Sequence, residues 1–167
     1  MKKISLVLSM LLSFIFPGCG QNSFDQHLRL LYRKTVPFIQ PKELTKALQQ
    51  NNTLIILDTR SWAEYKVSHL PQACFTDYDS FSVAKFKNLA LTTPIIVYCS
   101  VGVRSERVGE KLLQAGFTNV RNLYGGIFEW KNKGNPVYNH QNAPTDSVHA
   151  YNRYWGQWLT RATKVYE

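Results

Sequence analysis

The segment from Pro94 to Gly116, PIIVYCSVGVRSERVGEKLLQAG, constrains the fold more than any other part of the chain. It opens with an apolar, largely β-branched run over residues 95–98, and continues into apolar positions at helical spacing that stop at Gly116. This pattern predicts a buried strand, a tight loop and a helix. Cys99 then lies at the carboxyl end of the strand, and the loop after it leads into the start of the helix.

This position gives Cys99 an environment suited to a nucleophile. The backbone amides at the start of a helix form a binding site for anions, and such a site stabilises the thiolate, the reactive form of cysteine. Arg104 adds a permanent positive charge five residues later. The structural alternative is a buried cysteine that packs as a small hydrophobic residue. We interpret Cys99 as a catalytic nucleophile.

The loop resembles the active loop of the rhodanese-like sulfurtransferases, which runs from a nucleophilic cysteine through four residues to a closing position. Related phosphatases of the same fold have a loop one residue longer, because phosphate needs a wider cradle than a terminal sulfur. The resemblance implies that Cys99 carries sulfur as a persulfide and that the residues after it form the cradle. These residues are Ser100, Val101, Gly102, Val103, Arg104 and Ser105.

A second group of residues, upstream of the loop, also resembles the rhodanese-like family. It reads D-T-R, then E-Y and H-L-P, as in the amino-terminal signature of the family. We expect its charged residues to support the active edge. Asp58 would bond loop amides or pair with an arginine, Arg60 would support the edge or contact an anion, and Glu64 would form an ion pair. Ser68 and Gln72 stand where the family usually has glycine, so these turns are expected to differ in detail.

Arg104 has three possible roles under this resemblance. It stabilises the anionic loop, orients the sulfur donor, or ties the loop to the body of the domain. The sequence leaves these roles open.

Strand and helix patterns alternate along the centre of the chain. The expected strands cover residues 36–39, 54–57, 73–76, 95–98 and 119–123. Alternation of this kind predicts an α/β domain with a mainly parallel sheet of about five strands, helices on both faces, and a site at the carboxyl ends of the strands. The resemblance implies a rhodanese-like domain over residues 36–137, and a Y-G-G-x-x-x-W segment from Tyr124 to Trp130 closes it.

The cysteines and histidines indicate neither a metal site nor a cofactor. Cys19, Cys74 and Cys99 form no C-x-x-C pair, and the histidines lack ligand spacing. In a rhodanese sheet the strand of Cys74 lies two positions from that of Cys99, about 10 Å away. A disulfide requires Cα atoms within about 7 Å. We expect Cys74 to be a free thiol packed in the domain.

Residues 1–18 have the features of an export signal. Two lysines precede a mainly apolar run that ends in F-P-G-C-G. Gly18 and Cys19 resemble the lipobox of bacterial lipoproteins, although Phe16 replaces the usual leucine. We expect an exported, periplasmic or cell-envelope lipoprotein of a bacterium, held on a membrane through a lipid at Cys19. Ordinary secretory cleavage and an uncleaved anchor are the alternatives.

Two flanking segments extend the domain. Residues 19–35 form a tether and a short amphipathic helix, which we expect to pack on the domain rather than bind a membrane or partner. Residues 138–167 form a C-terminal extension with a helix that starts near Thr145 and also packs on the domain, a dimer or partner interface being the alternative. The predicted apolar stripe of that helix comprises Val148, Tyr151, Trp155, Trp158 and Ala162.

Charge and motifs exclude several classes of partner. The formal net charge is +9, and +7 without Lys2 and Lys3, but it is spread along the chain without a basic block. We therefore expect a solvated basic surface and no nucleic-acid binding. The G-x-G-x-x-G and P-loop patterns are absent, which argues against a nucleotide site.

The resemblance implies a rhodanese-type sulfurtransferase. Cys99 would take a sulfane sulfur from thiosulfate, a persulfide or a polysulfide and pass it to a thiol or cyanide-like acceptor. Because residues 100–103 carry no charge, we expect weak activity with dianionic thiosulfate and a persulfide or polysulfide as donor. An exported reactive thiol would also need a thiol-reductant partner protein. The alternative is a tethered rhodanese-fold binding or redox-sensing module without turnover.

Overall fold

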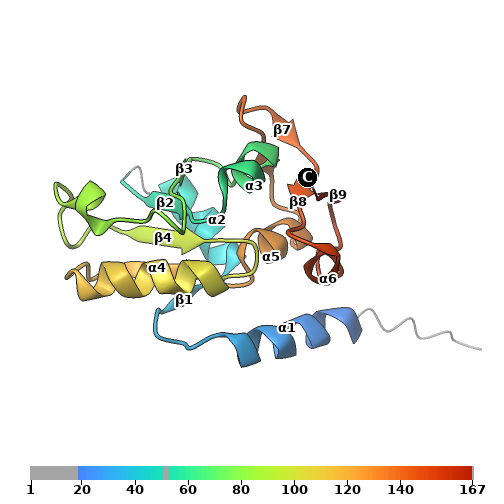
Figure 1. The fold of residues 1–167 in the computed structure, drawn as a ribbon, viewed down its shortest axis with the longest axis horizontal. Helices are drawn as coiled ribbons and strands as arrows, with labels where there is room; N and C mark the ends of the chain where they lie inside the picture. Colours follow the sequence, from blue (N-terminus) through green and yellow to red (C-terminus); the bar gives the residue numbers. More distant parts are fainter. Residues whose placement is uncertain (1–18, 51–52, 167) are drawn as a thin grey trace, which may run out of the picture.

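The structure is a computed structural model that describes residues 19–50 and 53–166 (Figure 1). The predicted export signal over residues 1–18 and the side chain of Cys19, the predicted lipidation site, lie outside what is described. Among the described residues, no helix is both long and apolar enough to cross a bilayer.

A five-stranded sheet forms the centre of the domain, as predicted. Its strand order is β1-β5-β4-β2-β3, and every neighbouring pair is parallel. In the register, Leu57 lies opposite Val97, which in turn lies opposite Asn122. The strands are β1 (Phe38–Ile39), β2 (Ile55–Asp58), β3 (Ala73–Phe75), β4 (Ile95–Tyr98) and β5 (Val120–Leu123).

The central strand β4 is buried along its whole length. Ile96 and Tyr98 belong to the hydrophobic core on one face of the sheet, whereas Ile95 and Val97 belong to the core on the other face. Successive side chains of a strand point to opposite faces. The continuous apolar run of β4 is therefore what a parallel strand covered on both sides requires.

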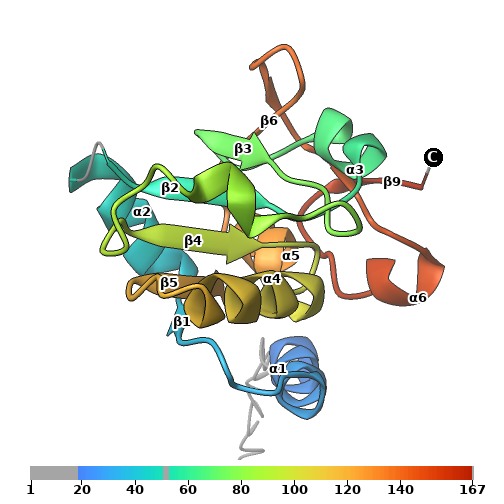
Figure 2. The same ribbon diagram turned by 60° about the vertical axis from the view of Figure 1, so that its left-hand side comes forward.

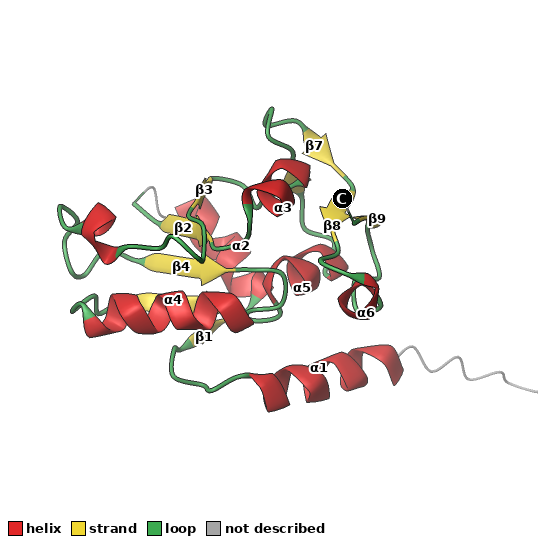
Figure 3. Cartoon of the chain, viewed as in Figure 1, coloured by secondary structure: helices red, strands yellow, loops and turns green. Residues whose placement is uncertain are grey.

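Helices cover both faces of the sheet (Figure 3). The core of one face includes residues from α2 (Pro41–Gln50) and α5 (Gly126–Asn132), and the core of the other includes Val108 and Leu112 from α4 (Val103–Gln114). Figure 2 shows α4 running alongside β4 and β5. Between β3 and β4 the chain forms a 3-10 turn, η1 (Val83–Phe86).

The short helix α3 (Trp62–Val67) follows β2 and begins with a capping box. The Ser61 hydroxyl accepts the backbone N–H of Glu64, and the Glu64 carboxylate accepts the backbone N–H of Ser61. Two amides at the start of the helix are thereby paired. The capping box fixes Glu64 at the carboxyl edge of the sheet.

The N-terminal helix α1 (Cys19–Leu31) packs on the domain through its apolar face, as predicted. Phe24 and Leu28 are buried, and the Phe24 ring stacks on Trp158 with 5.4 Å between ring centroids. In Figure 1 the N-terminal part of α1 lies beside α6 (Arg153–Gly156), near the opposite end of the chain. The two ends of the described chain are therefore in contact.

The C-terminal segment differs from the predicted long helix. Residues 147–149 form a strand, β8 (Ser147–His149), which pairs in parallel with β9 (Thr163–Val165), and the helix between them, α6, has only four residues. Tyr151 has a φ of 64°, which interrupts a right-handed helix, and the side chain of Asn152 caps α6. Before β8, a small antiparallel pair joins β6 (Val137–Tyr138) to β7 (Pro144–Thr145).

Cys74 is exposed, so the prediction that it packs inside the domain is wrong. It lies in β3, which forms the edge of the sheet, where the neighbouring Ala73 is buried. Alternation along this edge strand turns the thiol outward. Cys74 and Cys99 are both free thiols, as predicted. Strand β2 lies between β3, which carries Cys74, and β4, which leads into Cys99.

The two turns where the sequence departs from the family's glycines behave differently. Gln72 adopts a φ of 60°, the left-handed region that glycine favours, whereas Ser68 is extended with a φ of −169°. Only the turn at Gln72 therefore keeps a conformation for which glycine is the natural residue.

Candidate active site

Cys99 lies where β4 ends and the loop to α4 begins. Its side chain is buried, and its Sγ accepts a hydrogen bond from the backbone N–H of Gly102 at 3.1 Å. Gly102 is the N-cap of α4 and has a φ of 96°. A Cβ atom at this position would also lie 2.5 Å from the Tyr32 hydroxyl oxygen. The turn that directs this amide at the sulfur thus needs glycine for both conformation and space.

The start of α5 holds the first two carbonyls of the loop. The backbone N–H groups of Ile127 and Phe128 donate to the carbonyl oxygens of Cys99 and Ser100 at 2.9 and 3.1 Å. Gly126 permits this close approach, because a Cβ there would lie 2.2 Å from the Cys99 carbonyl oxygen. The helix that closes the sheet is therefore bonded directly to the cysteine loop.

Side chains from two other elements hold the next two carbonyls. The Tyr32 hydroxyl, just after α1, donates to the Val101 carbonyl oxygen at 2.5 Å, and Asn122 Nδ2 in β5 donates to the Gly102 carbonyl oxygen at 2.8 Å. All four carbonyls from residue 99 to residue 102 are therefore hydrogen-bonded. Carbonyls fixed in this way orient the peptide units around the sulfur, which is how a loop forms an anion cradle.

Glu64 ties the loop to α3. Its carboxylate accepts the two ends of the Arg104 guanidinium at 2.7 and 2.9 Å and the Ser100 hydroxyl at 2.8 Å. Burial by itself would raise the pKa of Glu64, but the hydrogen bonds and charge of Arg104 outweigh it and lower the pKa to about 2. Glu64 is the ion-pair partner that the sequence predicted, and of the three roles left open for Arg104 this contact favours closure of the loop.

A buried cluster supports the same edge of the sheet from below. Asp58 accepts hydrogen bonds from Arg60 Nε and Nη2 and from the Tyr98 hydroxyl, and Arg60 Nη2 also donates to the Ser68 carbonyl oxygen at 2.5 Å. Arg60 and Asp58 have no exposed surface. A sulfur donor in solvent cannot reach the buried Arg60 side chain. The structure therefore favours a supporting role for Arg60 over contact with an anion. Asp58 pairs with an arginine, as one of its two predicted roles required.

A pocket of about 190 Å³ opens over the cysteine. Five of the seven predicted loop residues line it, whereas Gly102 contributes its amide to the sulfur and Ser105 turns its hydroxyl to Asn122 Oδ1 at 2.7 Å. The lining residues are Leu31, Cys99, Ser100, Val101, Val103, Arg104, Tyr151 and Trp155.

A rhodanese-like domain model matches residues 40–133. The chain belongs to the rhodanese-like domain family. A tRNA uridine(34) hydroxylase of Streptococcus uberis is 34% identical over 115 residues, which are 66% of this chain and 34% of that protein. The chain thus spans about a third of the length of such curated relatives.

Solved structures show the same fold at low sequence identity. A thiosulfate sulfurtransferase from Pseudomonas aeruginosa has a TM-score of 0.60 at 21% identity, over 84% of this chain and 26% of that chain. A polysulfide-sulfur transferase homodimer from Wolinella succinogenes has a TM-score of 0.57 at 21% identity, over 72% of this chain and 90% of that chain.

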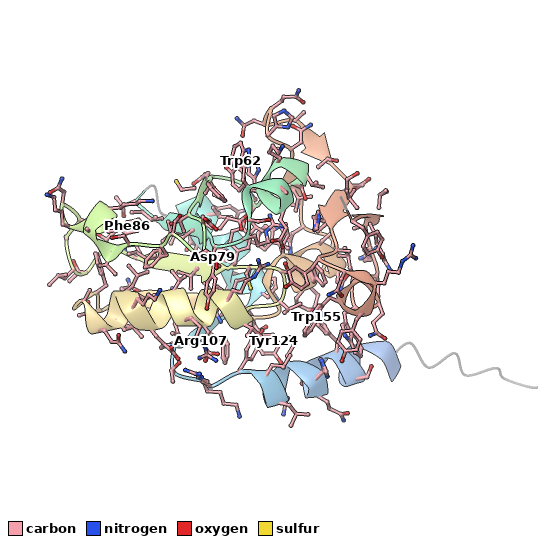
Figure 4. All side chains as sticks on the ribbon, viewed as in Figure 1. Trp62, Asp79, Phe86, Arg107, Tyr124 and Trp155 are labelled. Carbon is pink, nitrogen blue, oxygen red and sulfur yellow. The ribbon has the colours of Figure 1, made fainter. Side chains whose placement is uncertain are left out.

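Three walls of the pocket lie outside the matched rhodanese-like region. Leu31 ends α1, Tyr151 follows β8, and Trp155 belongs to α6. Figure 4 shows Trp155 between α6 and α1. The Arg104 guanidinium carbon lies 5.1 Å from the centre of the Tyr151 ring, over its face. This rhodanese-like domain therefore carries its own additions to the mouth of the site.

Sequence reasoning missed several residues of the site. The sequence pattern predicts Tyr32, Tyr98 and Asn122 only as helix or strand residues, and Tyr151 and Trp155 only as part of a helix stripe. Asn122 carries the clearest sequence signal, because an amide side chain within a predicted buried strand needs hydrogen-bond partners. For the aromatic residues, no sequence signal distinguishes a side chain that lines a pocket from one that packs in the core.

Among the described residues, no group of three or more histidine, cysteine, aspartate or glutamate side chains is placed to hold a metal ion. Of the buried carboxylates near the cysteine loop, Asp58 pairs with Arg60 and Glu64 pairs with Arg104.

Proposed function

We propose that this chain is a sulfurtransferase in which Cys99 carries a sulfane sulfur. The observation that supports it most directly is the position of Sγ. It lies at the base of an open pocket, within hydrogen-bond distance of a loop amide and at the N-terminus of a twelve-residue helix. Amides and the helix dipole stabilise a thiolate and, equally, the terminal sulfur anion of a persulfide.

The proposed reaction has two displacement steps. The Cys99 thiolate attacks the outer sulfur of the donor, the S–S bond of the donor breaks, and its electron pair leaves with sulfite from thiosulfate or a thiolate from a persulfide. Cys99 then holds the extra sulfur as a persulfide. In the second step a thiolate or cyanide attacks that sulfur and releases the Cys99 thiolate, so no external oxidant is consumed.

The charge of the pocket favours a persulfide or polysulfide donor over thiosulfate. Arg104 is the charged residue among those lining the pocket, and Glu64 already binds both ends of its guanidinium. A dianionic donor would lose hydration without meeting an uncompensated positive charge. We therefore expect sulfur loading from a polysulfide to exceed loading from thiosulfate.

The test is the intact mass of the full-length chain after incubation with thiosulfate and, separately, with polysulfide. We expect a gain of one sulfur atom that is lost on cyanide treatment with release of thiocyanate. Cys99→Ser should abolish the gain, and Cys74→Ser, at an exposed thiol two strands away, should retain it. No gain with either donor, in a protein whose Cys99 still alkylates rapidly, would contradict sulfur transfer and favour the redox-sensing module.

We also propose that the chain is an exported lipoprotein anchored at Cys19, with a reducing partner that keeps Cys99 free. This rests on the sequence pattern of residues 1–19. Labelling of the chain with an alkyne fatty acid in a bacterial host tests it, and Cys19→Ser should abolish the label. Equal labelling of Cys19→Ser would contradict the proposal.

A further inference from the structure

The donor pocket has walls that the catalytic region does not supply. Leu31, Tyr151 and Trp155 come from the two ends of the chain, outside residues 40–133. Together with Val101 and Val103 they make most of the lining apolar. When the reacting sulfur of a donor reaches Cys99, the group attached to that sulfur must therefore lie against these apolar side chains.

Packing at the base of α6 holds Trp155 in this wall. The His27 ring of α1 lies 5.6 Å from the Trp155 ring, and it stacks on Trp158 at 5.7 Å. Phe24 stacks on the same Trp158. A side chain fixed by such contacts loses little further freedom when a donor binds, which favours selective binding.

Tyr151 is held over the pocket in an unusual backbone conformation. Its φ of 64° is an outlier for a bulky residue, and its N–H donates to His149 Nδ1 at 3.1 Å. Its ring lies over the guanidinium of Arg104. Strained conformations persist only where the surroundings impose them, and they concentrate at ligand sites. The ring is thus directed at the mouth of the pocket rather than into the core, and half of its surface is exposed.

Size and charge limit what this pocket accepts. Its volume of about 190 Å³ is below the roughly 300 Å³ at which sites for drug-sized molecules begin. The Arg104 charge is paired with Glu64. The pocket therefore suits a compact donor whose substituent is apolar and uncharged.

We propose that Leu31, Tyr151 and Trp155 form a specificity subsite that selects an organic hydropersulfide, R–S–SH, with a short apolar R group. This inference rests on the sulfurtransferase function proposed above. The Cys99 thiolate attacks the outer sulfur, the S–S bond breaks with its electron pair on the inner sulfur, and R–S⁻ leaves. Cys99 keeps –S–SH, so atoms and electrons balance without a further reactant. The R group lies against the subsite throughout this step.

The test compares two hydropersulfides with the same reactive group. They are isobutyl hydropersulfide and 2-sulfoethyl hydropersulfide, each released in solution from a protected precursor. The rate of sulfur addition to Cys99 of the full-length chain is followed by intact mass. We expect a preference of at least tenfold for the isobutyl donor, because each buried methylene group contributes a factor of about four to affinity.

Variants then locate the preference. Trp155→Ala and Tyr151→Gly should each reduce the isobutyl rate severalfold and the sulfoethyl rate much less, whereas Tyr151→Phe should retain the preference. Tyr151→Gly fits the left-handed backbone, so it tests the ring without adding strain. The matched controls are Leu30→Ala and Leu91→Ala, at apolar side chains that are 85% and 51% exposed and lie outside the pocket lining.

The outcomes separate the two proposals. Failure of the wild-type chain to take sulfur from either hydropersulfide, and from polysulfide and thiosulfate as well, would overturn the proposed function, whereas failure with the two hydropersulfides alone would overturn the subsite. Loading from both at equal rates, or a preference that both Trp155→Ala and Tyr151→Gly leave intact, would overturn the subsite while the sulfurtransferase function stands. A preference lost in these two variants and kept in both controls would support it.

Discussion

The replacement Glu64→Gln is the most informative test of how the cysteine loop is closed. Glutamine keeps the size of the side chain but removes the charge that Arg104 and the Ser100 hydroxyl bind. Glu64 is 2% exposed, so solvent does not replace the lost interactions. We expect the variant to be less stable at neutral pH and slower to load sulfur, since Arg104 loses its anchor.

The magnitude follows from the pKa of Glu64, which burial would raise but Arg104 lowers from its ordinary 4.5 to about 2. One pKa unit corresponds to about 1.4 kcal/mol, so the ionised carboxylate contributes roughly 3 kcal/mol of folding stability. Because the folded-state pKa is the lower one, the contribution is complete above pH 4.5 and is lost as the pH falls toward 2. The difference in unfolding free energy between wild type and Glu64→Gln should therefore shrink as the pH falls from 4.5 toward 2.

The assay is urea unfolding followed by tryptophan fluorescence at several pH values between 7 and 3. Glu110→Gln serves as the control, because Glu110 also pairs with an arginine, Arg107 at 3.0 Å, but near the surface. We expect that control to change stability by less than about 1 kcal/mol. A stability difference for Glu64→Gln that is absent at pH 7, or that stays constant down to pH 3, would refute the reasoning.

Two further predictions concern the backbone and the buried cluster. Gly126→Ala places a Cβ 2.2 Å from the Cys99 carbonyl oxygen, and we expect it to abolish sulfur loading, whereas Gly116→Ala, with a φ of 97° but no atom nearer than 3.5 Å, should cost only about 1–2 kcal/mol. Equal effects of the two on loading would contradict the clash. Asp58→Asn leaves Arg60 without its counter-charge at 0% exposure and should destabilise the fold by about 3–5 kcal/mol in urea unfolding; a loss under about 1 kcal/mol would contradict this.

The central unit was predictable because its signals are local. The apolar run of residues 95–98 and the helical spacing after Cys99 each specify an element without reference to the rest of the chain. Short apolar runs that alternate with helical patterns predict the remaining strands of the sheet in the same way. The carboxylate of Glu64 was expected to pair, but its partner lies forty residues away, and only the folded chain shows that Arg104 is that partner.

The C-terminal segment was not predictable in the same way. Val148, Tyr151 and Trp155 match a helical period, yet β8 forms because Ser147 pairs with Thr163 in a distant strand. Pairing over that separation overrides a local pattern. The left-handed φ of Tyr151 also has no sequence signal, because tyrosine seldom adopts it. The pocket wall at Tyr151 therefore follows from tertiary contacts.

The contact between the two ends of the chain sets an order for assembly during synthesis. Phe24 and His27 are made before the strands of the central sheet, but their partners Trp155 and Trp158 are made after them. A nascent or truncated chain that stops before residue 150 has the reactive cysteine and its loop residues, yet lacks two walls of the pocket over them. The aromatic covering of the sulfur site is thus complete only after α6 has been made.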